Sequence, residues 1–185
     1  AGDAGLRDIL LVLNSDRTLE EVLDYLVNRA RELLDSQACV LYRFNPEREC
    51  VTVEAAAGLP SEMLGDATQT LELPMAAPHS LGSSVIDAMV LNEAPVTIQG
   101  AQFDAVTYVV DQAPSSASLT APVRAWFGHL ARHYRAAMSV PLEVKEEIYG
   151  TLGLYYTAPY EFTEEARLLA VGFASQAALA IENAH

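Results

Sequence analysis

Residues 136–157 have the sequence AAMSVPLEVKEEIYGTLGLYYT, in which two apolar and β-branched runs flank the polar turn Lys145-Glu146-Glu147. This pattern predicts a tight β-hairpin. Gly150 and Gly153 fall inside the second run, where glycine marks a bulge or the close approach of another backbone. Pro141 has no amide hydrogen and is expected where the strand ladder does not need a donor. The two strands are expected over Ala136–Val144 and Ile148–Thr157.

A helix is predicted near each end of the chain. Over residues 6–35, apolar side chains recur at steps of three and four, and most charged side chains lie outside that stripe. Thr163 can cap the exposed amides of Glu164-Glu165-Ala166, and these acids favour the positive end of a helix. The second helix is expected over 163–185. The stripe of the first segment comprises Leu6, Ile9, Leu10, Leu13, Leu19, Val22, Leu23, Leu26, Val27, Ala30, Leu33 and Leu34.

Between these ends, short strands alternate with a helix and an irregular stretch. The pattern deteriorates from Gly100 to Arg135, where an Ala/Ser/Pro-rich part at 113–122 indicates an exposed insertion. A short helix over Val123–Tyr134 is expected inside it. The other elements are expected as strands at 38–44, 50–55, 70–73 and 94–98, a turn at 45–48 and a helix at 80–91. The chain length favours one domain over residues 1–185.

The charge balance limits the classes of partner. The 185 residues include 11 Lys and Arg against 25 Asp and Glu, and the net charge of −14 repels phosphate backbones and anionic lipid heads. No apolar run reaches the ~18 residues that cross a bilayer, and no signal-peptide pattern is present. Cys39 and Cys50 provide neither a disulfide framework nor a four-ligand zinc site. These features indicate a cytoplasmic chain with free thiols, and its abrupt ends suggest a piece of a longer polypeptide.

Several stretches resemble the GAF domain family, and the order of predicted elements is similar to that of the family. They are Gly58 after a strand, Glu93-Ala-Pro-Val-Thr-Ile98 after the middle helix, Ala137-Met-Ser-Val-Pro-Leu142, Tyr149-Gly-Thr-Leu-Gly-Leu154, Phe162-Thr163-Glu164-Glu165 and Ala177-Ala-Leu-Ala-Ile-Glu-Asn-Ala184. The resemblance implies a GAF-like α+β fold with a central antiparallel sheet of about six strands. It also implies that the N- and C-terminal helices pack on one face, and that the insertion at about 100–135 covers a ligand pocket on the other.

The same resemblance implies a role in signal transduction. GAF domains commonly sense small molecules upstream of histidine kinases, cyclic-nucleotide enzymes or transcription activators, and they dimerise through their terminal helices. We therefore expect a homodimeric regulatory domain that relays pocket occupancy to an output domain in the same polypeptide, with a sensor histidine kinase as the expected parent. The alternatives are a ligand-free structural dimerisation module, and a gas or redox sensor that binds haem or iron.

Local charge inverts in the segment 124–135, which contains three of the eleven basic residues and two of the four histidines. On a helix, His129 and His133 share a face and can jointly coordinate a borderline metal. The arginines can instead offer planar bidentate donors to a small anion. Those arginines are Arg124, Arg132 and Arg135. Further metal ligands could come from His79, Asp104 or Asp111.

Aromatic residues near this segment are expected to line the pocket. A haem bound through one of the histidines would need such an apolar slot, although the same rings could pack as core. Covalent bilin attachment is disfavoured, because Cys39 and Cys50 lie on predicted strands rather than in the segment expected to line the pocket. No nucleophile elbow or phosphate loop indicates an enzyme. The expected ligand-binding residues are Tyr108, Arg124, Trp126, Phe127, His129, Arg132, His133, Met138 and Tyr155.

Overall fold

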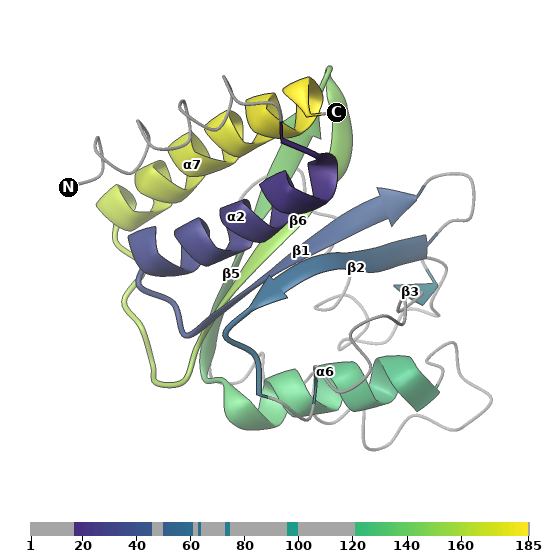
Figure 1. Ribbon diagram of the computed structural model, residues 1–185. Helices are drawn as coiled ribbons and strands as arrows, with labels where there is room; N and C mark the ends of the chain where they lie inside the picture. The colour runs from purple at the N-terminus through teal and green to yellow at the C-terminus, as the bar shows by residue number, and fades with distance from the viewer. Residues whose placement is uncertain are drawn as a thin grey trace.

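The computed structural model describes residues 17–45, 50–60, 63, 73–74, 96–99 and 121–184. The helices and strands follow one another as Figure 1 shows. Their bounds are α2 (Leu19–Leu33), β1 (Ala38–Asn45), β2 (Cys50–Ala57), β3 (Leu73–Pro74), β4 (Val96–Gln99), α6 (Ala121–His133), β5 (Ala136–Val144), β6 (Glu147–Tyr156) and α7 (Glu164–Asn183). The helices expected ahead of residue 17 and at 80–91, and most of the expected turn and insertion, lie outside these ranges.

The strands form one sheet in the order β3-β2-β1-β6-β5-β4, and every neighbouring pair is antiparallel. The four central strands have eight to ten residues each, whereas the described edge strands β3 and β4 have two and four residues. The expected antiparallel sheet is therefore found, with short strands at both edges. β2 extends two residues beyond its expected end at 55.

The β5–β6 hairpin turns on two residues. Lys145 and Glu146 have φ angles of 54° and 65°, the left-handed conformation that a type I′ turn needs at both central positions. β6 consequently begins at Glu147, one residue earlier than expected. Further along β6, a Cβ atom at Gly150 would collide with the carbonyl oxygen of Tyr42 in β1. The close backbone approach that glycine predicts is confirmed at this position.

Helices cover both faces of the sheet. Figure 1 shows α2 and α7 side by side on one face and α6 on the other. Side chains alternate along a strand, and this sends Cys39 and Leu41 of β1, together with Leu152 and Leu154 of β6, towards α2 and α7. All four are at most 1% exposed, and they form the core with the apolar sides of the two helices. The packing of helices from both ends of the chain on one face is as expected.

Threonine caps begin both of these helices. Thr163 Oγ1 accepts a hydrogen bond from the Ala166 amide at 3.1 Å, and Thr18 Oγ1 accepts one from the Glu21 amide at 3.2 Å. A cap of this kind contributes about 1 kcal/mol to stability. The predicted start of the C-terminal helix at Thr163 is thus confirmed. Of the helices in the described ranges, none is long and apolar enough to cross a membrane.

Candidate functional site

A buried hydrogen-bonded trio lies between the sheet and α6. Tyr42 of β1 and Tyr155 of β6 have their hydroxyl oxygens 2.8 Å apart. Trp126 of α6 donates its indole N–H to the Tyr42 hydroxyl at 3.1 Å. Both tyrosines are 1% exposed and Trp126 is 7% exposed. These three residues, here named the Tyr–Tyr–Trp trio, tie two central strands to the helix that covers them.

The strand register explains how the two tyrosines meet. Tyr42 pairs with Thr151 and Tyr155 pairs with Ala38, so the two tyrosines are four residues apart along the ladder. The Tyr155 ring crosses this distance by lying over Gly153, where a Cβ atom would be 2.6 Å from the Tyr155 hydroxyl oxygen. Gly153 was expected to mark a bulge or a close backbone. Its lack of a side chain instead makes room for the ring of Tyr155.

The inner side of α6 completes an aromatic wall. Trp126, Leu130 and Tyr134 are buried at steps of four residues, which places them along one side of the helix. The ring of Tyr134 lies 5.5 Å from that of Tyr155, centroid to centroid. Two residues expected in the pocket, Trp126 and Tyr155, are therefore brought together here, and Tyr42 and Tyr134 join them.

Beside this wall, four neighbouring positions of β5 and β6 that face α6 hold only small residues. Ala137 and Ser139 of β5, with Thr151 and Gly153 of β6, alternate with residues of the core. Thr151 donates its hydroxyl hydrogen to the carbonyl oxygen of Val140 at 3.0 Å, so Ser139, whose Oγ is 2.6 Å from Thr151 Oγ1, donates to Thr151. These four small residues are here named the small-residue floor. All four are buried, and the ring of Tyr155 covers Gly153.

Burial keeps the tyrosines of the trio protonated. Desolvation raises the pKa of Tyr42 to about 12, although hydrogen bonds to Tyr155 and Trp126 oppose the shift. Desolvation also raises the pKa of Tyr155 well above its ordinary value, and the neighbouring Tyr42 adds to this. The trio has three donor hydrogens and two bonds among its members. One hydroxyl hydrogen is thus available to an acceptor outside the trio.

The described basic side chains near the end of α6 belong to neither the trio nor the floor. Arg132 and His133 are exposed and His129 is half-buried. Arg135 donates from Nη1 to two carbonyl oxygens at the end of α6, at 3.1 and 2.9 Å, and so caps the helix. For the remaining expected site residues, α6 carries Arg124 and Phe127 as backbone positions only, and Tyr108 lies outside the described ranges.

Met138 is placed on the other face of the sheet, which corrects the expectation that it lines the pocket. It is 1% exposed and belongs to the core with α2 and α7. Its neighbours Ala137 and Ser139 face α6, because successive side chains of a strand point to opposite faces. The expectation was wrong because Met138 and its two neighbours in β5 point to opposite faces of the sheet.

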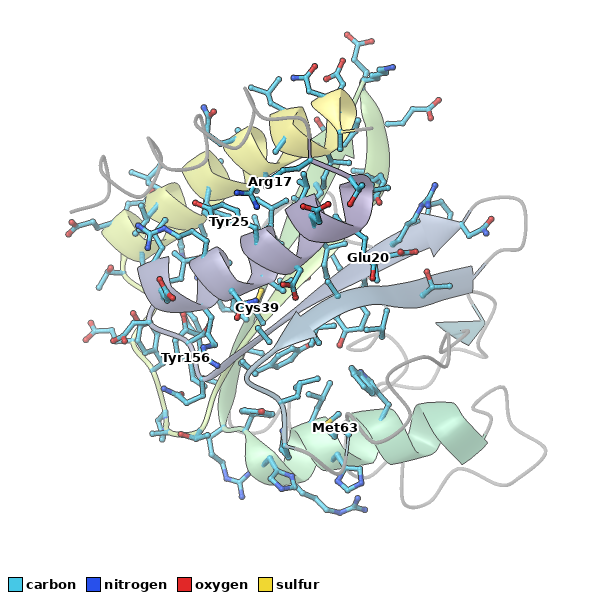
Figure 2. The ribbon with its side chains drawn as sticks, in the orientation of Figure 1. Arg17, Glu20, Tyr25, Cys39, Met63 and Tyr156 are labelled. Carbon is cyan, nitrogen blue, oxygen red and sulfur yellow. The ribbon has the colours of Figure 1, made fainter. Side chains whose placement is uncertain are left out.

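Cys39 is a buried structural thiol, as expected. It is 0% exposed on the side of β1 that α2 covers (Figure 2), and burial raises the pKa of its thiol. A protonated, inaccessible thiol is a poor nucleophile and a poor metal ligand. The side chain of Cys50 lies outside what the structure describes.

Tyr42, Ser139 and Thr151 also lie on this face, although the sequence did not predict them there. For Thr151 a signal was present, because side chains at an even spacing along a strand point to the same face. Thr151 precedes Tyr155 at an even spacing on β6. Once Tyr155 was assigned to the pocket face, the same assignment followed for Thr151.

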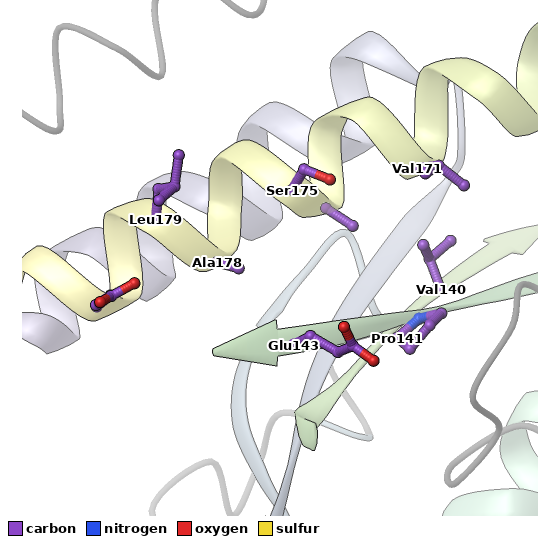
Figure 3. A pocket seen from close by; sticks show the side chains of 9 residues that line it. Val140, Pro141, Glu143, Val171, Ser175, Ala178 and Leu179 are labelled. Carbon is purple, nitrogen blue, oxygen red and sulfur yellow. The ribbon is translucent and has the colours of Figure 1, made fainter. Parts of the chain in front are cut away.

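A groove lies on the opposite face of the sheet, between α7 and the outer edge of β5 (Figure 3). This α7–β5 groove has a volume of about 470 Å³. Its lining is mostly apolar, with Pro141 of β5 and Val171 and Leu179 of α7, and includes the carboxylates of Glu143 and Glu182. The described part of β4 pairs with β5 up to Ser139 of β5. The groove lies beside the stretch of β5 after Ser139, which this part of β4 does not reach.

These features define an α+β domain in which helices cover both faces of an antiparallel sheet, with an aromatic wall and a floor of small residues on one face. The profile of the GAF domain family matches residues 16–182, and the chain belongs to that family. Comparison with curated proteins gives no match.

Solved structures with a similar fold come from several bacterial proteins. The GAF domain from Acinetobacter phosphoenolpyruvate-protein phosphotransferase is 21% identical, with a TM-score of 0.63 over 96% of this chain and 90% of that one. The phycocyanobilin-bound GAF domain from a cyanobacterial phytochrome is 15% identical, with a TM-score of 0.66 over 100% and 96%. A domain of a putative two-component sensor histidine kinase protein from Sinorhizobium meliloti 1021 is 16% identical, with a TM-score of 0.55 over 88% and 90%. At these identities the likeness shows the fold alone.

Proposed function

We propose that this chain is a regulatory domain that senses a small molecule on the α6 face of its sheet. GAF domains are generally sensory or regulatory rather than catalytic. The observation that carries the proposal is the small-residue floor beside the Tyr–Tyr–Trp trio. From Ala137 to Ser139 and from Thr151 to Gly153, the positions that face α6 hold no side chain larger than threonine. The sheet therefore places small, partly polar side chains next to an aromatic wall, and this mixture of residues is typical of a ligand site.

The polar groups of this site suit a ligand with an acceptor oxygen. The hydroxyl hydrogen left over in the Tyr42–Tyr155 pair is buried and has no acceptor among the described residues, and a buried donor without an acceptor costs about 1–3 kcal/mol. A carbonyl or carboxylate oxygen placed beside it removes that cost. An apolar part of the same molecule would then lie on Ala137, since the ring of Tyr155 already covers Gly153. The tyrosine hydroxyl is a neutral donor, so it can bond to a neutral carbonyl oxygen as well as to a charged carboxylate.

Signal transfer would use β6, which contributes residues to both faces. Tyr155 faces α6, whereas Tyr156 faces the other side and donates its hydroxyl hydrogen to the carbonyl oxygen of Leu34, at the end of α2, at 2.8 Å (Figure 2). The Tyr156 ring also stacks on Tyr160, just ahead of α7, with centroids 4.1 Å apart. A shift of β6 on ligand binding would therefore reach both helices. The ligand drives it only if it binds the two arrangements unequally, typically by ~1–3 kcal/mol.

The proposed receiver of this shift is a homodimer that pairs through α7. Leu168, Val171 and Leu179 are 63%, 42% and 43% exposed, and their spacing puts them on one stripe of the helix. A stripe of this kind is self-complementary across a twofold axis, so a second copy of the chain is the proposed partner. The fold shared with a domain of a putative two-component sensor histidine kinase supports an output domain of that class in the same polypeptide.

A melting-temperature screen of small carbonyl and carboxylate compounds tests the sensing proposal. Hits should raise the melting temperature of the unaltered chain and should lose their effect in Ala137→Leu, which fills the floor. Thr157→Val, in an exposed loop beyond β6, is the control and should keep the response. If no compound acts, or if hits act equally on Ala137→Leu, the floor is not a ligand site.

The trio also favours a second candidate function, a structural dimerisation module without a ligand. The rings of Tyr42, Trp126, Tyr134 and Tyr155 already cover part of the α6 face with their own contacts. In that case the leftover hydroxyl hydrogen is satisfied within the chain. The same screen separates the two functions, since the structural module should form a dimer whose melting temperature no compound changes.

A further inference from the structure

The two histidines of α6 form a pair that ligand sensing on the sheet does not use. His129 and His133 are four residues apart, and their ring centroids lie 5.8 Å apart with the ring planes at 41°. His129 is half-buried and His133 is exposed, so solvent reaches the pair in the last part of α6. Neutral imidazole is the commonest protein ligand of borderline divalent metals, and residues at this spacing share a helix face.

A hydrogen bond determines which nitrogen of His133 is available. Its Nδ1 atom lies 2.9 Å from the carbonyl oxygen of His129. Because a carbonyl oxygen only accepts, Nδ1 carries the hydrogen, and the neutral ring keeps its lone pair on Nε2. Metal-binding histidines typically hold their other ring N–H on a carbonyl or carboxylate oxygen, which orients the ring and increases its basicity. The ring of His133 is thus already arranged as a metal-binding imidazole.

The separation of the rings is close to that of two imidazoles on one ion. With a metal–nitrogen distance of about 2.1 Å, the ion lies ~3.2 Å from each ring centroid, and a tetrahedral angle then puts the centroids ~5.2 Å apart. The observed 5.8 Å is longer by only about 0.6 Å. Small rotations of the two side chains within their staggered wells are enough to close this difference.

Some charges near the two histidines favour a bound cation and others oppose it. The C-terminal end of a helix carries a negative partial charge, and the chain as a whole has a net charge of −14, so both favour a cation. Arg132 and Arg135 oppose it. The Nη1 atom of Arg135 is held on carbonyl oxygens at the end of the helix, whereas Arg132 directly precedes His133 in the sequence.

We propose that His129 and His133 bind one divalent transition-metal ion of the nickel, copper or zinc class through their Nε2 atoms. In the part of the chain that the structure describes, no group of three His, Cys, Asp or Glu side chains could hold a metal. Within the described residues, the two imidazoles are therefore the protein ligands. The bound ion links the last turn of α6 to the turn before it, directly ahead of β5.

Isothermal titration calorimetry of the chain with NiCl₂, and separately with ZnCl₂, tests the proposal. One ion should bind per chain, and His129→Ala and His133→Ala should each weaken binding by at least about tenfold. Thr157→Ala, in the exposed loop beyond β6, is the control and should bind the ion as the unaltered chain does. MgCl₂ should give no binding, because Mg²⁺ prefers oxygen ligands. Circular dichroism of each variant checks that substitution of these partly exposed side chains leaves the helix intact.

Arg132→Ala tests whether the bound ion is a cation or an anion. Removal of this neighbouring positive charge should tighten metal binding, whereas a site for anions would be weakened by the same change. The proposal is overturned if no ion binds, if Ni²⁺ binds both histidine variants as tightly as the unaltered chain, or if Arg132→Ala weakens metal binding. None of these outcomes depends on whether a small molecule binds at the small-residue floor, so the metal site and the sensing proposal stand or fall separately.

Discussion

The hydroxyl oxygens of Tyr42 and Tyr155 lie 2.8 Å apart, although the two residues are four positions apart along the β1–β6 ladder. Tyr42 also accepts the indole hydrogen of Trp126, so it is the middle member of the trio. Removal of the middle member leaves both partners without their bond to the trio, whereas removal of an end member leaves the other bond in place. This arrangement ranks the effects of substitutions within the trio.

Tyr42→Phe should destabilise the chain more than Tyr155→Phe does. The first change leaves the Trp126 N–H and the Tyr155 hydroxyl unpaired in the interior, at about 3 kcal/mol, and the second removes one bond, at about 1 kcal/mol. Urea unfolding followed by circular dichroism measures both. Tyr149→Phe is the control, because the buried Tyr149 hydroxyl has no hydrogen-bond partner in the described structure, so its removal should be neutral or stabilising. An equal cost for all three substitutions would contradict the proposed order of bonds.

Gly150→Ala and Gly153→Ala should differ in what they disturb. At Gly150 the added Cβ atom meets the backbone of β1, which can retreat only by opening the ladder, so a loss of several kcal/mol is expected. At Gly153 the Cβ atom meets the ring of Tyr155, and a rotation of that side chain can relieve the clash at about 1–3 kcal/mol. Unfolding gives the two losses, and near-ultraviolet circular dichroism should change for folded Gly153→Ala because an aromatic ring has moved. An unchanged aromatic spectrum would show that Tyr155 does not lie over Gly153.

The sequence predicted best those features that depend on neighbouring residues. The cap at Thr163 and the turn at Lys145 and Glu146 are both set by local chemistry, a hydroxyl beside free amides and polar residues between two strands. The helix that follows Thr163 and the hairpin around the turn were therefore predicted to within about two residues at each end, the ordinary uncertainty of such boundaries.

The composition of the candidate site was harder to predict, because it depends on which face of the sheet each strand presents to α6. Met138 and Tyr155 are both large and apolar enough for either face, and only the packed structure separates them. Tyr42 was missed for a related reason. Its role comes from a contact with Trp126, 84 positions away in the sequence, and no local pattern encodes a contact at that separation.

Stability should fall in alkaline solution because the trio must remain protonated. The pKa of Tyr42 is raised from 10 to about 12 in the folded state, so its contribution is fully present below pH 10 and is lost as the pH rises towards 12. Tyr155 shifts in the same direction. Urea unfolding at a series of pH values should show this loss, and Tyr42→Phe should show a smaller one. If the variant and the unaltered chain lose stability equally above pH 10, other groups cause the alkaline transition.

Charge placed on the exposed stripe of α7 should weaken the proposed dimer without unfolding the chain. Leu168 is 63% exposed and Leu179 is 43% exposed, so Leu168→Glu and Leu179→Glu should change the free energy of unfolding of the monomer by less than about 0.5 kcal/mol. In a twofold interface each substitution brings two like charges together in apolar surroundings, which should raise the dimer dissociation constant at least about tenfold. Sedimentation equilibrium over a range of concentrations measures that constant. Lys145→Glu, in the exposed β5–β6 turn, adds negative charge away from the stripe and should leave it unchanged. A chain that stays monomeric at high concentration before any substitution would show that α7 does not pair with a second copy.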